Sequence, residues 1–150
     1  MSRKNQHIAG MEKLLTHLKN TKLEYLKASD HANYSEEKRF FNQQALIRNR
    51  FFQEILSELQ TLGAAVDDLI ISRFNFDQLL VSSIDTLKTT SVEKCLEADK
   101  ALLMIYKEFI DFGENENPKF TQHVSSIEIA INKNQVIFDK FLFKKQNSNY

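Results

Sequence analysis

The chain has 150 residues, of which 42% are hydrophobic and 27% charged, and its 20 Lys and Arg residues balance 20 Asp and Glu residues. This composition is typical of a single globular domain and excludes disorder for most of the chain. Zero net charge provides no overall field that would hold nucleic acid or an anionic membrane surface, so we expect neither partner.

One cysteine in the whole chain excludes an internal disulfide and a cysteine-built zinc site, which fits a reducing compartment. The first ten residues lack the apolar segment of a signal peptide, and no stretch has the ~18 uninterrupted apolar residues of a membrane helix. We therefore expect a cytoplasmic protein.

The spacing of apolar residues predicts helices. Three glycines and one proline are too few for the many tight turns of a sheet protein. Steps of three and four residues predict a first helix with its buried stripe at Met11, Leu14, Leu18, Thr21, Tyr25, Ala28 and Ala32. A second helix begins after Asn33, which has capping-box spacing to Glu36, and ends at Gly63. Its stripe is Phe41, Ala45, Arg48, Phe52, Ile55, Leu59 and Leu62.

The second half of the chain repeats this pattern. Thr90 and Glu93 have capping-box spacing at the start of a third helix, which Gly113 ends. Its stripe is Val92, Cys95, Asp99, Leu102, Tyr106 and Phe109. Asn117 and Pro118 open a fourth helix, since proline is tolerated in a first helical turn. Its stripe is Phe120, Val124, Ile127, Ile131, Asn134, Phe138 and Phe141.

The lengths of the connections predict the topology. Short polar connections join helices one and two, and helices three and four, so each pair forms an antiparallel hairpin. Residues 64–89 form a long connection whose apolar run suggests a short helix inside a crossover. An all-α, ferritin-like four-helix bundle with one crossover is favoured over a simple up-down-up-down bundle. We expect one domain over 1–150, with its core at about 8–143 and short flexible tails.

Each stripe carries a polar residue near its middle, which predicts a polar layer at Thr21, Arg48, Asp99 and either Asn134 or Gln135. Arg48 and Asp99 are the natural pair, because a buried guanidinium needs a carboxylate to satisfy its donors. Bundle proteins build metal and cofactor sites at this level, but a buried polar layer also specifies helix register without any chemistry. The second interpretation is favoured here.

Metal chemistry has little support in the sequence. A di-iron site of the bundle type needs Glu-x-x-His on two helices, and this motif is absent. His31 and His123 fall at predicted helix ends, where solvated or capping roles are expected, and Cys95 falls on an apolar stripe as a small core residue. The remaining metal candidates are carboxylates: Asp30, Glu54, Glu97 and Asp99.

Several short segments follow one another in a recognisable order and spacing: Met11 to Leu15 with Glu24, Tyr25 and Ala28; Arg48 with Phe51 and Glu54; Leu62 and Gly63; and Cys95 through Asp99 to Tyr106, Lys107 and Glu108. In this order they resemble a bacterial family of unknown function in the ferritin-like superfamily. The resemblance implies a ferritin-like fold, with potential ligands just before the helix-two arginine, at Asp99 and near Gln135. This chain has Ile47, Asp99 and Gln135 there, so only the acid is kept. The family implies no established activity.

We therefore expect a non-enzymatic protein that acts by interaction or structural support in a stress or storage setting, without a cofactor. The alternative is a carboxylate-based metal-binding or oxidoreductase-like protein. Residues 69–81 are more apolar than a connection requires, and they predict a homodimer formed through the crossover. The other interpretation of this segment is that it covers the core of its own bundle.

Overall fold

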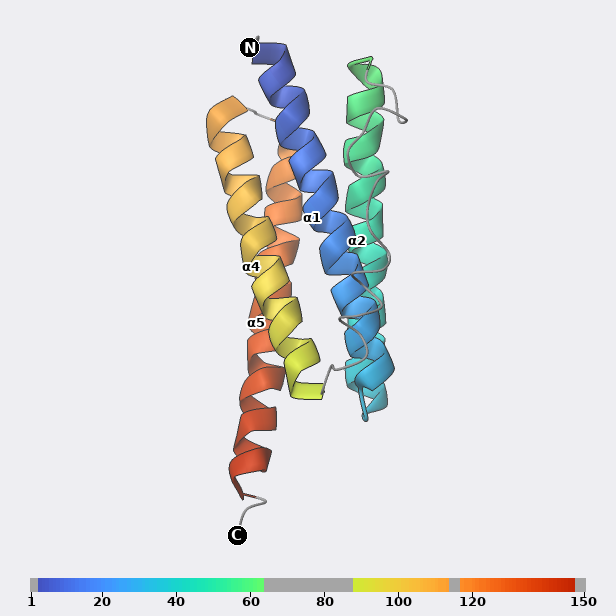
Figure 1. Ribbon diagram of the computed structural model, residues 1–150, viewed down its shortest axis with the longest axis vertical. Coiled ribbons are helices and arrows are strands. Elements are labelled where there is room, and N and C mark those ends of the chain that lie inside the picture. Colours follow the sequence, from blue (N-terminus) through green and yellow to red (C-terminus); the bar gives the residue numbers. More distant parts are fainter. Residues whose placement is uncertain (1–2, 64–87, 114–116, 148–150) are drawn as a thin grey trace.

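The structure is a computed structural model that describes residues 3–63, 88–113 and 117–147. In these ranges the chain forms four long helices, namely α1 (Arg3–His31), α2 (Ser35–Thr61), α4 (Lys88–Gly113) and α5 (Pro118–Asn147). They pack lengthwise as a bundle, and the end of α5 extends beyond the other three (Figure 1). The all-α, four-helix prediction is confirmed.

The helices run in two directions. In Figure 1, α1 and α5 descend while α2 and α4 ascend, so α1 with α2 and α4 with α5 form the two expected antiparallel hairpins. As a result, α2 ends at the same end of the bundle at which α1 begins, and α4 begins at the opposite end. The predicted short crossover helix and the apolar residues 69–81 lie outside the described residues.

Helix packing defines the cross-section. Helix α1 packs closely against both α2 and α4, and α4 packs against α5. In cross-section α2 therefore lies opposite α4, and α1 lies opposite α5. The fourth side, between α2 and α5, is joined by long side chains, including an ion pair of 3.1 Å between Lys119 Nζ and Glu58 Oε1.

Two helix starts differ from the predictions. The residue before the first turn of α2 is Tyr34, whose side chain makes no capping hydrogen bond, so the capping box at Asn33 and Glu36 is wrong. Helix α4 already begins at Lys88, which places Thr90 inside the helix and makes the second predicted box wrong too. A capping sequence favours a helix start at a given residue without enforcing it, because helical backbone bonds can continue past it.

Two other helix ends agree with the sequence. The side-chain oxygen of Asn117 accepts a hydrogen bond of 3.0 Å from the backbone N–H of Lys119 at the start of α5. Gly63, directly after α2, has a φ of 87°, a left-handed conformation that glycine adopts without steric cost.

The helices extend further toward both ends of the chain than the sequence analysis predicts. Helix α1 begins at Arg3 and α5 continues to Asn147, so most of both tails is helical. His7 explains this at the first end, because its ring stacks on Phe109 of α4 with the ring centroids 5.0 Å apart. Stacking on a core residue fixes the first turns of α1, which an apolar stripe beginning at Met11 does not include.

The core is divided by the polar level that the sequence predicts. The larger hydrophobic cluster extends from Met11 to Leu18 on α1 and includes Leu102 and Phe109 of α4. The smaller cluster lies toward the other end, around Tyr25, Phe41 and Cys95. Thr21, Arg48, Asp99 and Asn134 are fully buried at the level between the two clusters.

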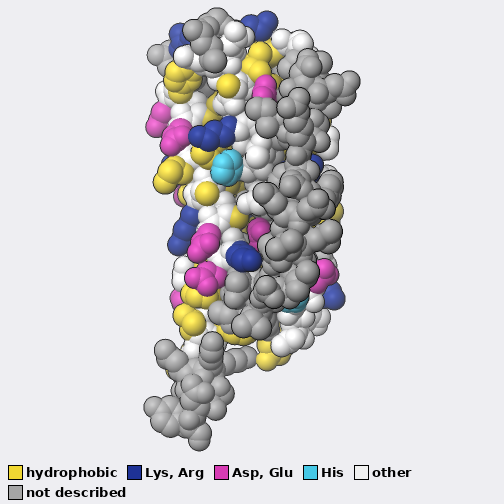
Figure 2. Space-filling view, in the orientation of Figure 1, with side chains coloured by type: hydrophobic (Ala, Val, Ile, Leu, Met, Phe, Trp, Pro, Cys, Tyr) yellow, Lys and Arg dark blue, Asp and Glu magenta, His cyan; other side chains and the backbone are white. Residues whose placement is uncertain are grey.

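The outer surface carries both signs of charge. Figure 2 shows acidic and basic side chains interspersed with apolar ones over the described part of one face. Within the described ranges, no helix has the length and apolar content needed to cross a membrane.

Candidate functional site

Arg48 on α2 and Asp99 on α4 form a buried ion pair at the centre of the bundle. The Nε atom of Arg48 donates to Oδ1 of Asp99 at 3.2 Å, and Nη2 donates to Oδ2 at 3.0 Å. Both side chains are 0% exposed. Two roughly parallel hydrogen bonds between planar groups fix their relative position, so this pair sets the register of α2 against α4.

Tyr25 on α1 and Asn134 on α5 extend this pair to the other two helices. The Tyr25 hydroxyl donates a hydrogen bond to Oδ2 of Asp99 and accepts one of 2.5 Å from Nδ2 of Asn134. Each helix thus contributes one residue to a continuous chain of hydrogen bonds. We call Tyr25, Arg48, Asp99 and Asn134 the four-helix polar layer.

Burial is the strongest influence on the ionisation of this layer. It raises the pKa of Asp99 above its ordinary value, and the Arg48 guanidinium offsets part of that rise. Burial opposes the charge of Arg48, but attraction to Asp99 and Tyr25 leaves the pKa of the guanidinium above its ordinary value. Burial and the Asp99 charge raise the pKa of Tyr25 well above 10.0. Tyr25 therefore remains a phenol that can donate to Asp99.

The four-helix polar layer has little capacity for further ligands at Asp99. Its carboxylate accepts hydrogen bonds from two Arg48 nitrogens and from the Tyr25 hydroxyl. A metal cation at Asp99 would have to displace the guanidinium, whose positive charge also repels it. Two buried atoms of the layer, Nη1 of Arg48 and Oδ1 of Asn134, lack a hydrogen-bond partner among the described residues.

A second buried hydrogen-bond chain joins three helices. The Tyr106 hydroxyl of α4 lies 2.8 Å from Nδ1 of His123 on α5, and Nε2 of His123 lies 2.5 Å from Oε2 of Glu54 on α2. An ionised Glu54 carboxylate only accepts, so Nε2 carries a proton, and the neutral ring then accepts from Tyr106 at Nδ1. The ring of Phe51 stacks on His123 with the centroids 3.8 Å apart.

The surroundings of this hydrogen-bond chain favour the neutral forms of Tyr106 and His123. Burial lowers the pKa of His123 below 6.5, although the hydrogen bond and charge of Glu54 raise it; the charges of Lys119 and Arg50 lower it further. Burial raises the pKa of Tyr106 far above 10.0, so its hydroxyl keeps its proton. Because Tyr106 is fully buried and His123 is 2% exposed, only Glu54, at 35% side-chain exposure, connects this chain to solvent.

The other residues of the predicted layer lie apart from this network. Thr21 is buried at the expected level, but its hydroxyl donates to the backbone carbonyl oxygens of Leu18 and His17 in its own helix. Gln135 points away from the layer and donates to Asp139 at the surface, at 3.0 Å. Of the two alternatives on α5, the structure places Asn134 in the layer.

The four metal candidates do not converge. Asp30 and Glu97 are exposed, Asp99 is bound to Arg48, and Glu54 contacts His123. Over 3–63, 88–113 and 117–147, no group of three His, Cys, Asp or Glu residues is placed to hold a metal ion. The carboxylates that the sequence singles out therefore form no three-ligand site within these ranges.

The expectation for His123 is wrong. It does not cap a helix or face solvent but lies in the core between Phe51, Tyr106 and Glu54. His31, by contrast, lies in the last turn of α1. Cys95 packs in the core, as its place on the stripe suggests, and burial raises the pKa of its thiol well above 9.0. A protonated, enclosed thiol is unreactive.

The sequence contains a signal for the hydrogen-bond chain from Tyr106 to Glu54, although the stripe analysis did not identify it. Tyr106 lies on the predicted stripe, and a buried tyrosine hydroxyl needs a hydrogen-bond partner. His123 follows Phe120 by three residues and precedes Ile127 by four, so it shares their helix face.

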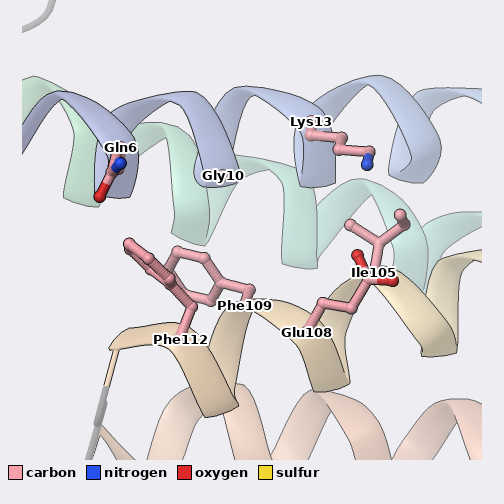
Figure 3. A pocket seen from close by; sticks show the side chains of 7 residues that line it. All are labelled: Gln6, Gly10, Lys13, Ile105, Glu108, Phe109 and Phe112. Atoms are coloured by element: carbon pink, nitrogen blue, oxygen red, sulfur yellow. The ribbon is translucent and has the colours of Figure 1, made fainter. Parts of the chain in front are cut away.

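A surface pocket of about 260 Å³ lies between α1 and α4, at the end of the bundle where α1 begins. Its lining residues are Gln6, Gly10 and Lys13 of α1, and Ile105, Glu108, Phe109 and Phe112 of α4. Figure 3 shows the two phenylalanine rings at one end, beneath Gln6 and Gly10. At the other end, the charged ends of Lys13 and Glu108 lie on either side of Ile105.

Comparison with known proteins adds no assignment. No protein family, no curated protein and no solved structure matches the chain.

Proposed function

We propose that this protein is a ferritin-like four-helix bundle with a non-enzymatic role, acting by interaction or structural support in the bacterial cytoplasm. Its helix directions support the ferritin-like part of the proposal. Two antiparallel hairpins whose second and third helices run parallel require one long connection, which is the connectivity of ferritin-like folds. The short segments from Met11 to Glu108 that resemble a ferritin-like family support it independently.

The occupation of both Asp99 oxygens by protein donors carries the non-enzymatic part of the proposal. Three donors from two helices occupy its two oxygens, and the nearest cation is a fully buried arginine. A catalytic or metal-binding carboxylate must keep an oxygen accessible to its ligand, whereas a register-setting carboxylate binds only protein donors. Asp99 therefore acts on the bundle itself, and the external surface provides the function.

Metal titration tests this proposal against the carboxylate-based alternative. The purified chain is incubated with excess Fe(II), Mn(II) or Zn(II) at neutral pH, passed through a desalting column and analysed for metal content. We expect far less than one metal ion per chain. Stoichiometric retention that Glu54→Gln or Asp99→Asn abolishes would establish the alternative instead. Glu93→Gln is the matched control, because Glu93 is exposed on α4 and is not among the four candidate carboxylates.

A further inference from the structure

The pocket between α1 and α4 has a fixed apolar end. Phe109 is 5% exposed, and its ring is held between His7, at 5.0 Å, and Phe120, also at 5.0 Å between centroids. A β-carbon at Gly10 would lie 2.8 Å from Cδ2 of Phe109, so glycine is what allows the ring to approach α1 this closely. Phe112 is 50% exposed and completes an aromatic surface that an apolar group can cover.

The opposite end of the pocket carries two opposite charges that are not paired with each other. Lys13 of α1 and Glu108 of α4 both line it, and their charged ends lie on either side of Ile105 in Figure 3. Among the described ion pairs and hydrogen bonds, neither side chain has a partner. A group that supplies both a carboxylate and an ammonium would pair with both of these charges.

We propose that this pocket binds a free α-amino acid with an aromatic or large apolar side chain. Its carboxylate contacts Lys13, its ammonium contacts Glu108, and its side chain covers Phe109 and Phe112. An α-amino acid is the simplest molecule that presents both charges at one end and an apolar group at the other. A volume of about 260 Å³ is at the small end of ligand pockets, which suits a ligand of this size.

Titration of the isotope-labelled chain with L-phenylalanine, followed by amide chemical shifts, tests the proposal. We expect shifts confined to residues 6–13 and 105–112, with a dissociation constant of about 1 mM or lower. Two analogues separate the two charges, since 3-phenylpropanoate lacks the ammonium and phenethylamine lacks the carboxylate. Each analogue should bind about tenfold more weakly, because one charge in the pocket then stays unpaired.

Surface substitutions assign the binding to these side chains. Lys13→Gln and Glu108→Gln should each weaken L-phenylalanine binding by about tenfold while leaving the helical circular-dichroism signal unchanged. Lys100→Gln and Glu93→Gln are matched controls on exposed positions of α4, and they should bind as the unmodified chain does. The proposal is wrong if L-phenylalanine causes no shifts at this pocket, if both analogues bind as tightly as L-phenylalanine, or if neither pocket variant weakens binding.

Discussion

Arg48 and Asp99 meet across the diagonal of the bundle. Their helices, α2 and α4, lie opposite each other in cross-section, and the guanidinium reaches the carboxylate through hydrogen bonds of 3.2 and 3.0 Å. Tyr25 and Asn134 connect the other diagonal, between α1 and α5. Because both diagonals meet at Asp99 and Tyr25, a shift of any one helix along its axis breaks a hydrogen bond in the four-helix polar layer.

Removing one member of the ion pair should destabilise the fold strongly. Asp99→Asn leaves a buried guanidinium without its counter-charge, and Arg48→Met leaves a buried carboxylate. We expect each to lower the free energy of unfolding by about 3 to 5 kcal/mol, measured by urea denaturation. Glu97→Gln, two residues away on the exposed face of α4, should change it by less than about 0.5 kcal/mol.

The double variant separates charge from packing. In Arg48→Met with Asp99→Leu no charge remains to be desolvated, so its stability should exceed that of either single variant and approach that of the unmodified chain. An Asp99→Asn protein that unfolds at the same urea concentration as the unmodified chain would show that the pair is not buried in solution.

Acid should destabilise the protein through His123. Burial holds the pKa of His123 below 6.5 in the fold, so the unfolded chain takes up its proton first as the pH falls. The stabilising contribution is complete above pH 6.5 and is lost as the pH decreases through the folded pKa. We expect the free energy of unfolding to decrease below pH 6.5, with a slope from this residue of at most about 1.4 kcal/mol per pH unit.

A comparison of two histidine variants identifies the source of this slope. His17 titrates in the same direction, because burial and the charge of Lys13 lower its pKa. His123→Gln keeps hydrogen-bonding groups between Tyr106 and Glu54 but cannot titrate, so it should flatten the profile between pH 5 and 7. His17→Gln should remove only the part of the slope that His123 does not account for. A profile that His123→Gln leaves unchanged would assign the slope to other groups.

The close approach of α1 to α4 makes Gly10 sensitive to substitution. Gly10→Ala improves helix propensity by about 0.8 to 1.0 kcal/mol, but its β-carbon would lie 2.8 Å from the Phe109 ring. Overpacking of this kind costs about 1 to 3 kcal/mol, so we expect a net loss of stability in thermal melts. In a Phe109→Leu background the narrower side chain leaves room for the β-carbon, and Gly10→Ala should then raise the stability in thermal melts.

Periodicity predicted the helices because each buries one continuous apolar stripe, and the stripe positions Arg48 and Asp99 indicated the ion pair. The predicted stripe of α5 is only partly correct. The structure buries the face that carries Phe120, His123, Ile127, Ala130 and Asn134. Val124 and Ile131, which the prediction placed on the stripe, are only partly buried.

Contacts between residues of different helices cannot be predicted from the apolar stripe of one helix. The chain from Tyr106 through His123 to Glu54 requires the axial offsets of α2, α4 and α5 together, since each side chain belongs to a different helix. The pocket at Lys13 and Glu108 likewise depends on how far Gly10 lets α4 approach α1. Such offsets are set by the packing of whole helices, so sequence patterns within one helix cannot supply them.

The two ends of the Tyr25 hydrogen-bond chain should respond differently to deletion. Tyr25→Phe removes one of the two donors to Oδ2 of Asp99, which still accepts from Arg48, and it removes the acceptor of Nδ2 of Asn134. One buried amide group is then without its described partner, which costs about 1 to 3 kcal/mol, so we expect a loss of that size in urea denaturation.

Asn134→Leu removes the amide from the other end of the same chain. Oδ1 of Asn134 has no partner among the described residues, so its removal relieves one unsatisfied buried atom, while the Tyr25 hydroxyl still donates to Asp99. Leucine has a similar size and adds apolar contact, and the change in stability should therefore stay within about 1 kcal/mol of zero. If Asn134→Leu proves as destabilising as Tyr25→Phe, then Oδ1 has a partner in solution, and Asn134 rather than Tyr25 limits the stability of this layer.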